Sequence, residues 1–116
     1  STIKDVLTGY PMNIEAEAIE YYNKGTEIIY TDANLAIDYF LKAIKIDPNF
    51  VQAYDNIGKA YRMIKKYDLA LKYYKYSIEL FPNGDVAHTN LALVYTKLER
   101  YQDAITEHKK ETIFSR

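Results

Sequence analysis

The chain has 116 residues, of which 48% are hydrophobic and 27% charged, and its formal net charge is -1. This composition is typical of a folded globular domain and argues against a disordered chain or a strongly basic nucleic-acid-binding domain. Without cysteine there is no disulfide and no thiolate metal site, and no apolar run approaches the ~20 residues of a membrane-spanning helix. We therefore predict a cytoplasmic protein without a cofactor, which contacts neither nucleic acid nor membrane.

The first 13 residues show little helical periodicity. Apolar residues at positions 3–7 are spaced for one short face, but Gly9 and Pro11 interrupt it. We interpret residues 1–13 as an N-terminal tail; the alternative is a short irregular helix whose apolar residues pack on a neighbouring surface. Because the chain begins with Ser1 rather than Met, we expect a processed chain or an excised piece of a longer one.

Helical periodicity begins at Ile14. From Ile14 to about Tyr30, apolar residues recur at steps of three and four, and Asn13 is the expected N-cap. A second amphipathic helix begins at residues 31–32. It must stop at Pro48, which cannot continue the hydrogen-bond ladder.

The stretch 51–84 has the clearest pattern of the chain. It predicts two helices on either side of a polar turn at Lys65–Lys66, and Pro82 closes the unit. Asp85 is the expected N-cap of a fifth helix, and a sixth follows a turn at residues 99–100. The sequence therefore predicts six helices in three antiparallel pairs, with no strand pattern.

The chain matches itself when it is shifted by 34 residues. Pro48 then falls on Pro82, and with a turn one residue shorter Gly25 falls on Gly58, whose equivalent in the third copy is Ala92. These small residues let the first helix of a pair approach the second. Because no single pair can bury both of its faces, we expect three pairs to stack and share a core.

This pattern resembles the tetratricopeptide repeat family over residues 16–116. The resemblance rests on the period, an aromatic–Leu–Gly–Tyr pattern in the first helix of a pair, an Ala–aromatic–Ala pattern in the second, and the closing proline. Residues 51–84 carry nearly the full pattern, with Ser77 in place of the usual alanine. The third copy departs most, in two usually aromatic positions and one alanine position that hold His88, His108 and Glu111.

The resemblance implies an all-α fold, a right-handed superhelical stack of three antiparallel helix pairs (an α-α solenoid). It implies one domain at residues 14–116, with repeats at approximately 16–50, 51–84 and 85–116. It also implies a non-catalytic protein–protein interaction or scaffold module, whose first helices line a concave groove for a peptide segment of a partner. No spacing of residues indicates a catalytic triad or a phosphate loop, so we expect no enzyme.

The predicted groove residues are those that core packing leaves over on the first helix of each pair. They are Tyr22, Asn23, Thr26 and Ile29, then Asp55, Asn56, Lys59, Arg62 and Met63, then Thr89, Asn90, Leu93, Thr96 and Lys97. Asn23, Asn56 and Asn90 hold equivalent places, and an asparagine amide can bond both polar groups of a peptide backbone. The alternative is that asparagine is simply common there in the family.

Charge distinguishes the three repeats. Residues 17–50 have three basic and six acidic residues, residues 51–84 six and three, and residues 85–116 five of each. The basic middle repeat predicts a preference for an acidic or C-terminal segment at Lys59 and Arg62, although a merely solvated face is an alternative.

Some members of the family grip chaperone tails with Lys, Asn and Arg residues spread over three repeats. In this chain Asn56 matches one of that set, but the required cations are missing. The other matching places hold Tyr22, Thr26, Val86 and Asn90. We therefore do not expect binding of that type.

Two further hypotheses concern the third repeat. His88 and His108, with Glu107 and Glu111 nearby, suggest a metal site, but both histidines occupy packing positions and we expect no metal. The second hypothesis is that the chain forms a homo-oligomer, because no capping helix follows the last repeat. This self-association surface would contain Ile105, Ile113 and Phe114.

Overall fold

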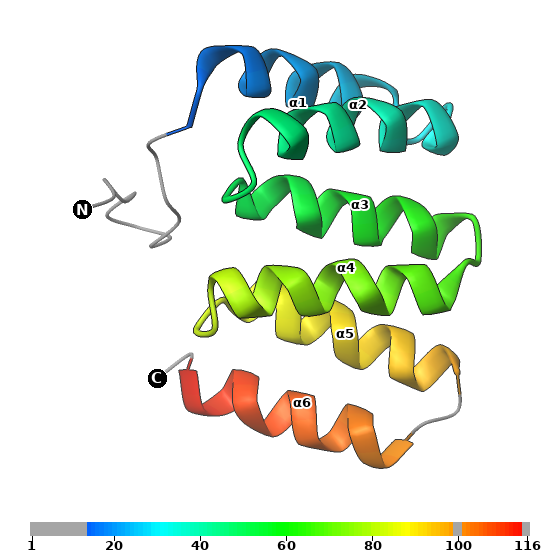
Figure 1. Cartoon of the computed structure of the whole chain (residues 1–116). Coiled ribbons are helices and arrows are strands. Elements are labelled where there is room, and N and C mark those ends of the chain that lie inside the picture. Colours follow the sequence, from blue (N-terminus) through cyan, green and yellow to red (C-terminus); the bar gives the residue numbers. More distant parts are fainter. Residues whose placement is uncertain (1–13, 99–100, 115–116) are drawn as a thin grey trace.

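The computed structural model describes residues 14–98 and 101–114, although not the side chains of residues 101, 102, 104 and 111–114. The predicted tail at residues 1–13 lies outside the described residues. The described chain forms six helices (Figure 1) and no strand. They are α1 (Ala16–Ile28), α2 (Ala33–Ile46), α3 (Val51–Met63), α4 (Tyr67–Leu80), α5 (Asp85–Lys97) and α6 (Tyr101–Phe114).

The helix ends follow the predicted signals with two differences. The Asp32 carboxylate caps α2 by accepting the backbone N–H of Leu35 at 3.0 Å. The polar turn between α3 and α4 is confirmed, and Lys65 there has a φ of 64°. The prediction that Asp85 is an N-cap is wrong: Asp85 is the first residue of α5, and Gly84 holds the cap position. The N-cap of α1 is Glu15, while Asn13 lies outside the described residues.

Consecutive helices pack as the predicted pairs, α1 with α2, α3 with α4 and α5 with α6. Contacts of α2 with α3 and of α4 with α5 join the pairs, so that α1 and α6 lie at opposite ends of the stack (Figure 1). The first helices of the second and third pairs, α3 and α5, also touch directly. The shortest extent of the molecule is 18 Å, which is close to two helices of about 10 Å each. The all-α stack of three pairs is therefore confirmed.

Glycine and aromatic side chains interlock at the centre of the first two pairs. A Cβ atom built on Gly25 would lie 2.5 Å from a ring carbon of Phe40, and one built on Gly58 would lie 2.5 Å from a ring carbon of Tyr74. Both rings are fully buried. The two glycines therefore permit the close approach of paired helices that the sequence predicts.

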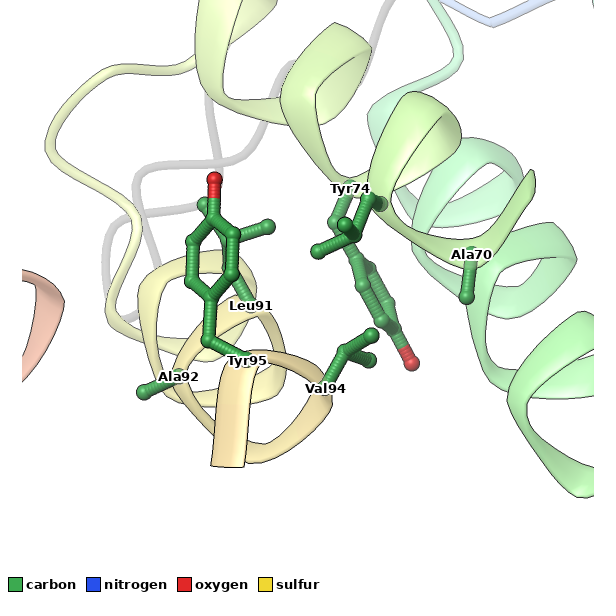
Figure 2. Packing of buried hydrophobic residues seen from close by; sticks show 7 residues of the cluster. Ala70, Tyr74, Leu91, Ala92, Val94 and Tyr95 are labelled. Carbon is green, nitrogen blue, oxygen red and sulfur yellow. The ribbon is translucent and has the colours of Figure 1, made fainter. Parts of the chain in front are cut away.

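The second and third pairs share a core between α4 and α5. Figure 2 shows the ring of Tyr74 between its own helix and Val94, with Leu91 and Tyr95 on the neighbouring turns of α5. Ala70 and Ala92 are fully buried in this cluster, where their small side chains let the helices approach. A similar cluster joins the first and second pairs around Phe40 and Ile57.

The outer face of α1 differs in chemistry from the corresponding faces of α3 and α5. In α3 this face consists of Ala53, Ile57 and Ala60, all fully buried against the preceding pair. In α5 it consists of Ala87, Leu91 and Val94, which are equally buried. The equivalent residues of α1 are exposed and charged, namely Glu20, Lys24 and Glu27.

Candidate protein-binding face

The predicted binding residues lie on α1, α3 and α5, and we call the side chains that these helices expose the first-helix face. Several large apolar side chains are exposed on it, among them Tyr30 at 72%, Val86 at 51% and Leu93 at 42%. Exposed apolar side chains beside polar ones are typical of surfaces that contact another molecule. The face has two halves, one between α1 and α3 and one between α3 and α5. They differ in whether their polar side chains are already bonded to other residues of the chain.

Tyr22 of α1 and Tyr30, which follows α1, engage the polar side chains of α3. The Asn56 amide nitrogen donates a hydrogen bond to the hydroxyl oxygen of Tyr22 at 2.9 Å. The Lys59 ammonium donates to the hydroxyl of Tyr30 and lies 4.7 Å from the centroid of the same ring. Three of the predicted binding residues, Tyr22, Asn56 and Lys59, therefore form contacts between the first and second pairs.

Tyr22 is a packing residue as well as a hydrogen-bond partner. Its ring lies 4.8 Å from that of Phe50 and 5.7 Å from that of Phe40, measured between centroids. Burial raises the pKa of its phenol, the Asn56 hydrogen bond lowers it and the Asp55 carboxylate raises it again, with a net increase. The hydroxyl is thus neutral over the ordinary pH range and remains both a donor and an acceptor.

Asp55 lies beneath the face rather than on it, since only 7% of the residue is exposed. Its charge and that of Arg62 both act on the Tyr74 hydroxyl, whose pKa burial raises far above the ordinary value; Arg62 lowers this pKa and Asp55 raises it. Asp55 is therefore part of the structural support of α3.

Three polar side chains between α3 and α5 are not engaged by the described part of the chain. The side chains of Arg62, Asn90 and Lys97 make no hydrogen bond or ion pair within it. Leu93 lies between Asn90 and Lys97 on α5, and Met63, which is 38% exposed, follows Arg62 on α3. This half of the face thus combines an amide, two cations and exposed apolar groups.

A sequence model of the tetratricopeptide repeat matches residues 39–72, which run from the middle of α2 to the first turns of α4. The chain also has the repeat period and the stack of paired helices that this family shows.

Residues 39–72 thus match one tetratricopeptide repeat.

Similar solved structures agree with this assignment. The crystal structure of MamA is 25% identical with a TM-score of 0.82, and the match covers 85% of this chain and 58% of that one. The second repeat domain of Spaghetti (RPAP3), bound to the HSP90 peptide SRMEEVD, is 21% identical with a TM-score of 0.81, covering 85% and 93%. The first repeat domain of Spaghetti, bound to the same peptide, is 18% identical with a TM-score of 0.82, covering 89% and 83%. A search of curated proteins finds no match.

These likenesses support the fold of the chain. The chain is an all-α, right-handed stack of three antiparallel helix pairs. It spans about 58% of the length of the MamA chain. None of the described helices is both long and apolar enough to cross a membrane.

The three asparagines predicted to form a ladder have three different environments. Asn23 is exposed, Asn56 is bonded to Tyr22, and Asn90 is half-buried without a hydrogen-bond partner among the described side chains. Ile29, also predicted to line the groove, is only 4% exposed and packs in the core against the start of α2. Its place in the groove was wrong, because the chain turns directly after Ile28 and carries Ile29 inward.

Tyr30 is the residue of this face that the sequence analysis missed. It lies 33 positions before Met63, which is the same offset that relates Gly25 to Gly58. The repeat offset therefore places Tyr30 at the position equivalent to the predicted binding residue Met63. Tyr30 was overlooked because it falls just beyond the end of α1.

The third repeat replaces a pair of tyrosines with a buried histidine–carboxylate pair. Tyr21 and Tyr39 stack with centroids 6.4 Å apart and 28° between the ring planes, and Tyr54 and Tyr73 stack at 6.5 Å and 30°. The equivalent residues of the third repeat are His88 and Glu107, whose Nδ1 and Oε2 atoms are 2.6 Å apart.

The second ring nitrogen of His88 has a partner too. Nε2 lies 2.8 Å from the carbonyl oxygen of Pro82, and the Tyr54 hydroxyl donates to the Pro48 carbonyl at the same distance. His108, by contrast, is exposed. No group of three metal-binding side chains occurs in the part of the chain with described side chains. The histidine is thus bonded to neighbouring helix and turn atoms.

One open depression of about 340 Å³ lies away from the first-helix face. Residues 65–69 and Leu98 line it, at the turn between α3 and α4 and at the end of α5. It contains none of the predicted binding residues.

The fully buried Tyr74 hydroxyl has no hydrogen-bond partner among the described residues. We expect Tyr74→Phe to raise the free energy of unfolding by up to about 1 kcal/mol, because it removes an unsatisfied buried group. Tyr54→Phe is the matched control. It should lower stability by about 1 kcal/mol, because the Tyr54 hydroxyl donates to Pro48. Urea unfolding monitored by circular dichroism measures both, and a loss of stability in Tyr74→Phe would contradict the expectation.

Proposed function

We propose that this chain binds a segment of a partner protein along the first-helix face, which we take to line a concave groove. The observation that supports this most directly is the set of free polar and exposed apolar side chains between α3 and α5. Among the described residues, the polar groups of this set form no hydrogen bond or ion pair that would stabilise the fold. A bound segment would give them partners.

Two solved structures of similar fold carry an HSP90 peptide, which supports the use of this architecture as a peptide receptor. The tail-gripping cations of the family are absent from the corresponding places here, as the sequence indicates. We therefore propose a different partner, an acidic segment attracted by the net basic middle repeat. We further propose that residues 14–116 act as one domain, preceded by a tail at residues 1–13.

A pool of fluorescein-labelled, terminally blocked nonapeptides with glutamates at random positions tests this proposal. Lys59→Ala combined with Arg62→Ala should weaken binding about tenfold and reduce its salt dependence, because two cations leave the first-helix face. Fluorescence anisotropy at two salt concentrations measures both effects.

The matched control is Lys72→Ala combined with Lys75→Ala. It removes the same charge from the same repeat, but from exposed positions on α4. Equal effects of the two double variants, or no binding by the parent chain, would contradict the proposal.

A second candidate function is self-association through α6, and one observation favours it. Ile105 is 48% exposed, whereas its equivalents in the first two repeats, Ile37 and Leu71, are 4% and 5% exposed because the next pair covers them. The side chains of Ile113 and Phe114, the other predicted members of this surface, lie outside the described residues. The exposed isoleucine is the kind of apolar group that a second copy would cover.

Ile105→Glu should abolish any dimer of the chain without unfolding the monomer, because the substituted side chain already lies at the surface. Multi-angle light scattering across a hundredfold range of concentration measures this. A parent chain that stays monomeric at every concentration would contradict self-association.

A further inference from the structure

The first-helix face is divided into an occupied half and an open half. Between α1 and α3, Asn56 and Lys59 are already turned toward Tyr22 and Tyr30. A segment bound there would have to break both contacts before it gained any. Breaking two hydrogen bonds reduces the net gain from new ones, because each exchange is close to balanced.

The half between α3 and α5 requires no such exchange. Arg62, Asn90 and Lys97 have no hydrogen-bond or ion-pair partner among the described residues, and Leu93 and Met63 are partly exposed. The nearest carboxylate on α3, Asp55, is buried beneath the face. A ligand that reaches this half therefore meets cations that are not yet neutralised.

The spacing on α5 limits the ligand further. Leu93 and Lys97 are four residues apart on one helix, so their Cβ atoms are neighbours at about 5–6 Å. An extended peptide advances about 3.3 Å per residue, and every second side chain points the same way. Two side chains that are two positions apart in an extended peptide are therefore spaced about as far apart as Leu93 and Lys97.

We propose that the bound segment lies over the half of the face between α3 and α5, and that it carries an aliphatic residue two positions from an acidic one. The aliphatic side chain contacts Leu93, while the carboxylate pairs with Lys97 and Arg62. The Asn90 amide bonds the backbone of the segment. This inference rests on the proposed function, which it makes more specific.

The test uses terminally blocked, fluorescein-labelled nonapeptides of glycine and serine that carry one leucine and one glutamate, separated by none to three residues. Affinity for the parent chain should be highest with one intervening residue, by about fivefold over the other spacings. Leu93→Asp should weaken binding of that peptide about tenfold. Tyr30→Ala, a substitution of an exposed apolar side chain on the occupied half, should change it less than about twofold.

The outcomes separate this inference from the proposed function. If the random glutamate pool binds but the spacing has no effect, or if Tyr30→Ala weakens binding and Leu93→Asp does not, the inference is overturned and the proposed function stands. If neither the pool nor any spaced peptide binds the parent chain, both are overturned.

Discussion

Replacing Glu107 with leucine should lower the free energy of unfolding by about 3 kcal/mol, because the change leaves the buried His88 without the acceptor at Nδ1. The exposed fractions of the His88 and Glu107 side chains are 3% and 11%, so water does not replace the lost partner. Far-UV circular dichroism during urea unfolding measures the loss.

A double substitution makes this prediction sharper. His88→Tyr combined with Glu107→Tyr installs the stacked tyrosines that the other two repeats have in these positions. We expect this variant to recover stability to within about 1 kcal/mol of the parent chain, because a buried ion pair replaced by well-packed apolar groups is often neutral. Lys110→Met serves as the control: its ammonium is 3.4 Å from Glu107 but half exposed, and its loss should cost less than about 0.5 kcal/mol. The singles His88→Tyr and Glu107→Tyr complete the comparison. If the double variant loses as much stability as the two singles together, the two residues are not coupled.

Gly58→Ala should destabilise the chain by about 2 kcal/mol, although alanine favours helix over glycine by about 1 kcal/mol. The added Cβ would lie 2.5 Å from the Tyr74 ring, and that ring is fully buried between helices and cannot move aside cheaply. The midpoint of thermal unfolding should fall accordingly.

A compensating change identifies the cause. The double variant Gly58→Ala with Tyr74→Leu should lose less stability than the sum of the losses of the two single variants. The smaller side chain at position 74 leaves room for the new methyl group. At Ala92, which holds the glycine position of the third repeat, the reverse change to glycine should cost about 1 kcal/mol from helix propensity alone. If Gly58→Ala instead stabilises the chain, the prediction is contradicted, because α3 and α4 must then move apart at little cost in free energy.

The sequence predicted the fold well because its signals are local and repeated. Pro48 and Pro82 end helices wherever they stand, and Gly58 opposite an aromatic ring requires close packing in any copy of the unit. Three concordant copies at one period leave few alternative arrangements. The Asp85 cap was mispredicted because a cap and a first helical residue differ by one position of the backbone, which side-chain type does not fix.

The sequence predicted where the residues of the candidate site lie, but not which of them are already bonded to other side chains. Periodicity placed Asn56 and Lys59 on the correct helix, yet their engagement depends on tyrosines 29 and 34 residues away. Long polar side chains take the rotamer that tertiary neighbours offer, and no pattern along one helix shows those neighbours. Glu107 was expected near His88, but their direct pairing was not predicted for the same reason, since it spans 19 residues and two helices.

The charged outer face of α1 limits how this chain can grow. Stacking one copy's α6 on another's α1 would bury Glu20, Lys24 and Glu27, whose desolvation no apolar surface repays. Repeated head-to-tail addition, the route from a solenoid to a filament, is thereby obstructed at every step. We therefore expect an assembly through the exposed isoleucine of α6 to be a symmetric pair, and raising the concentration should fill that pair without producing fibres.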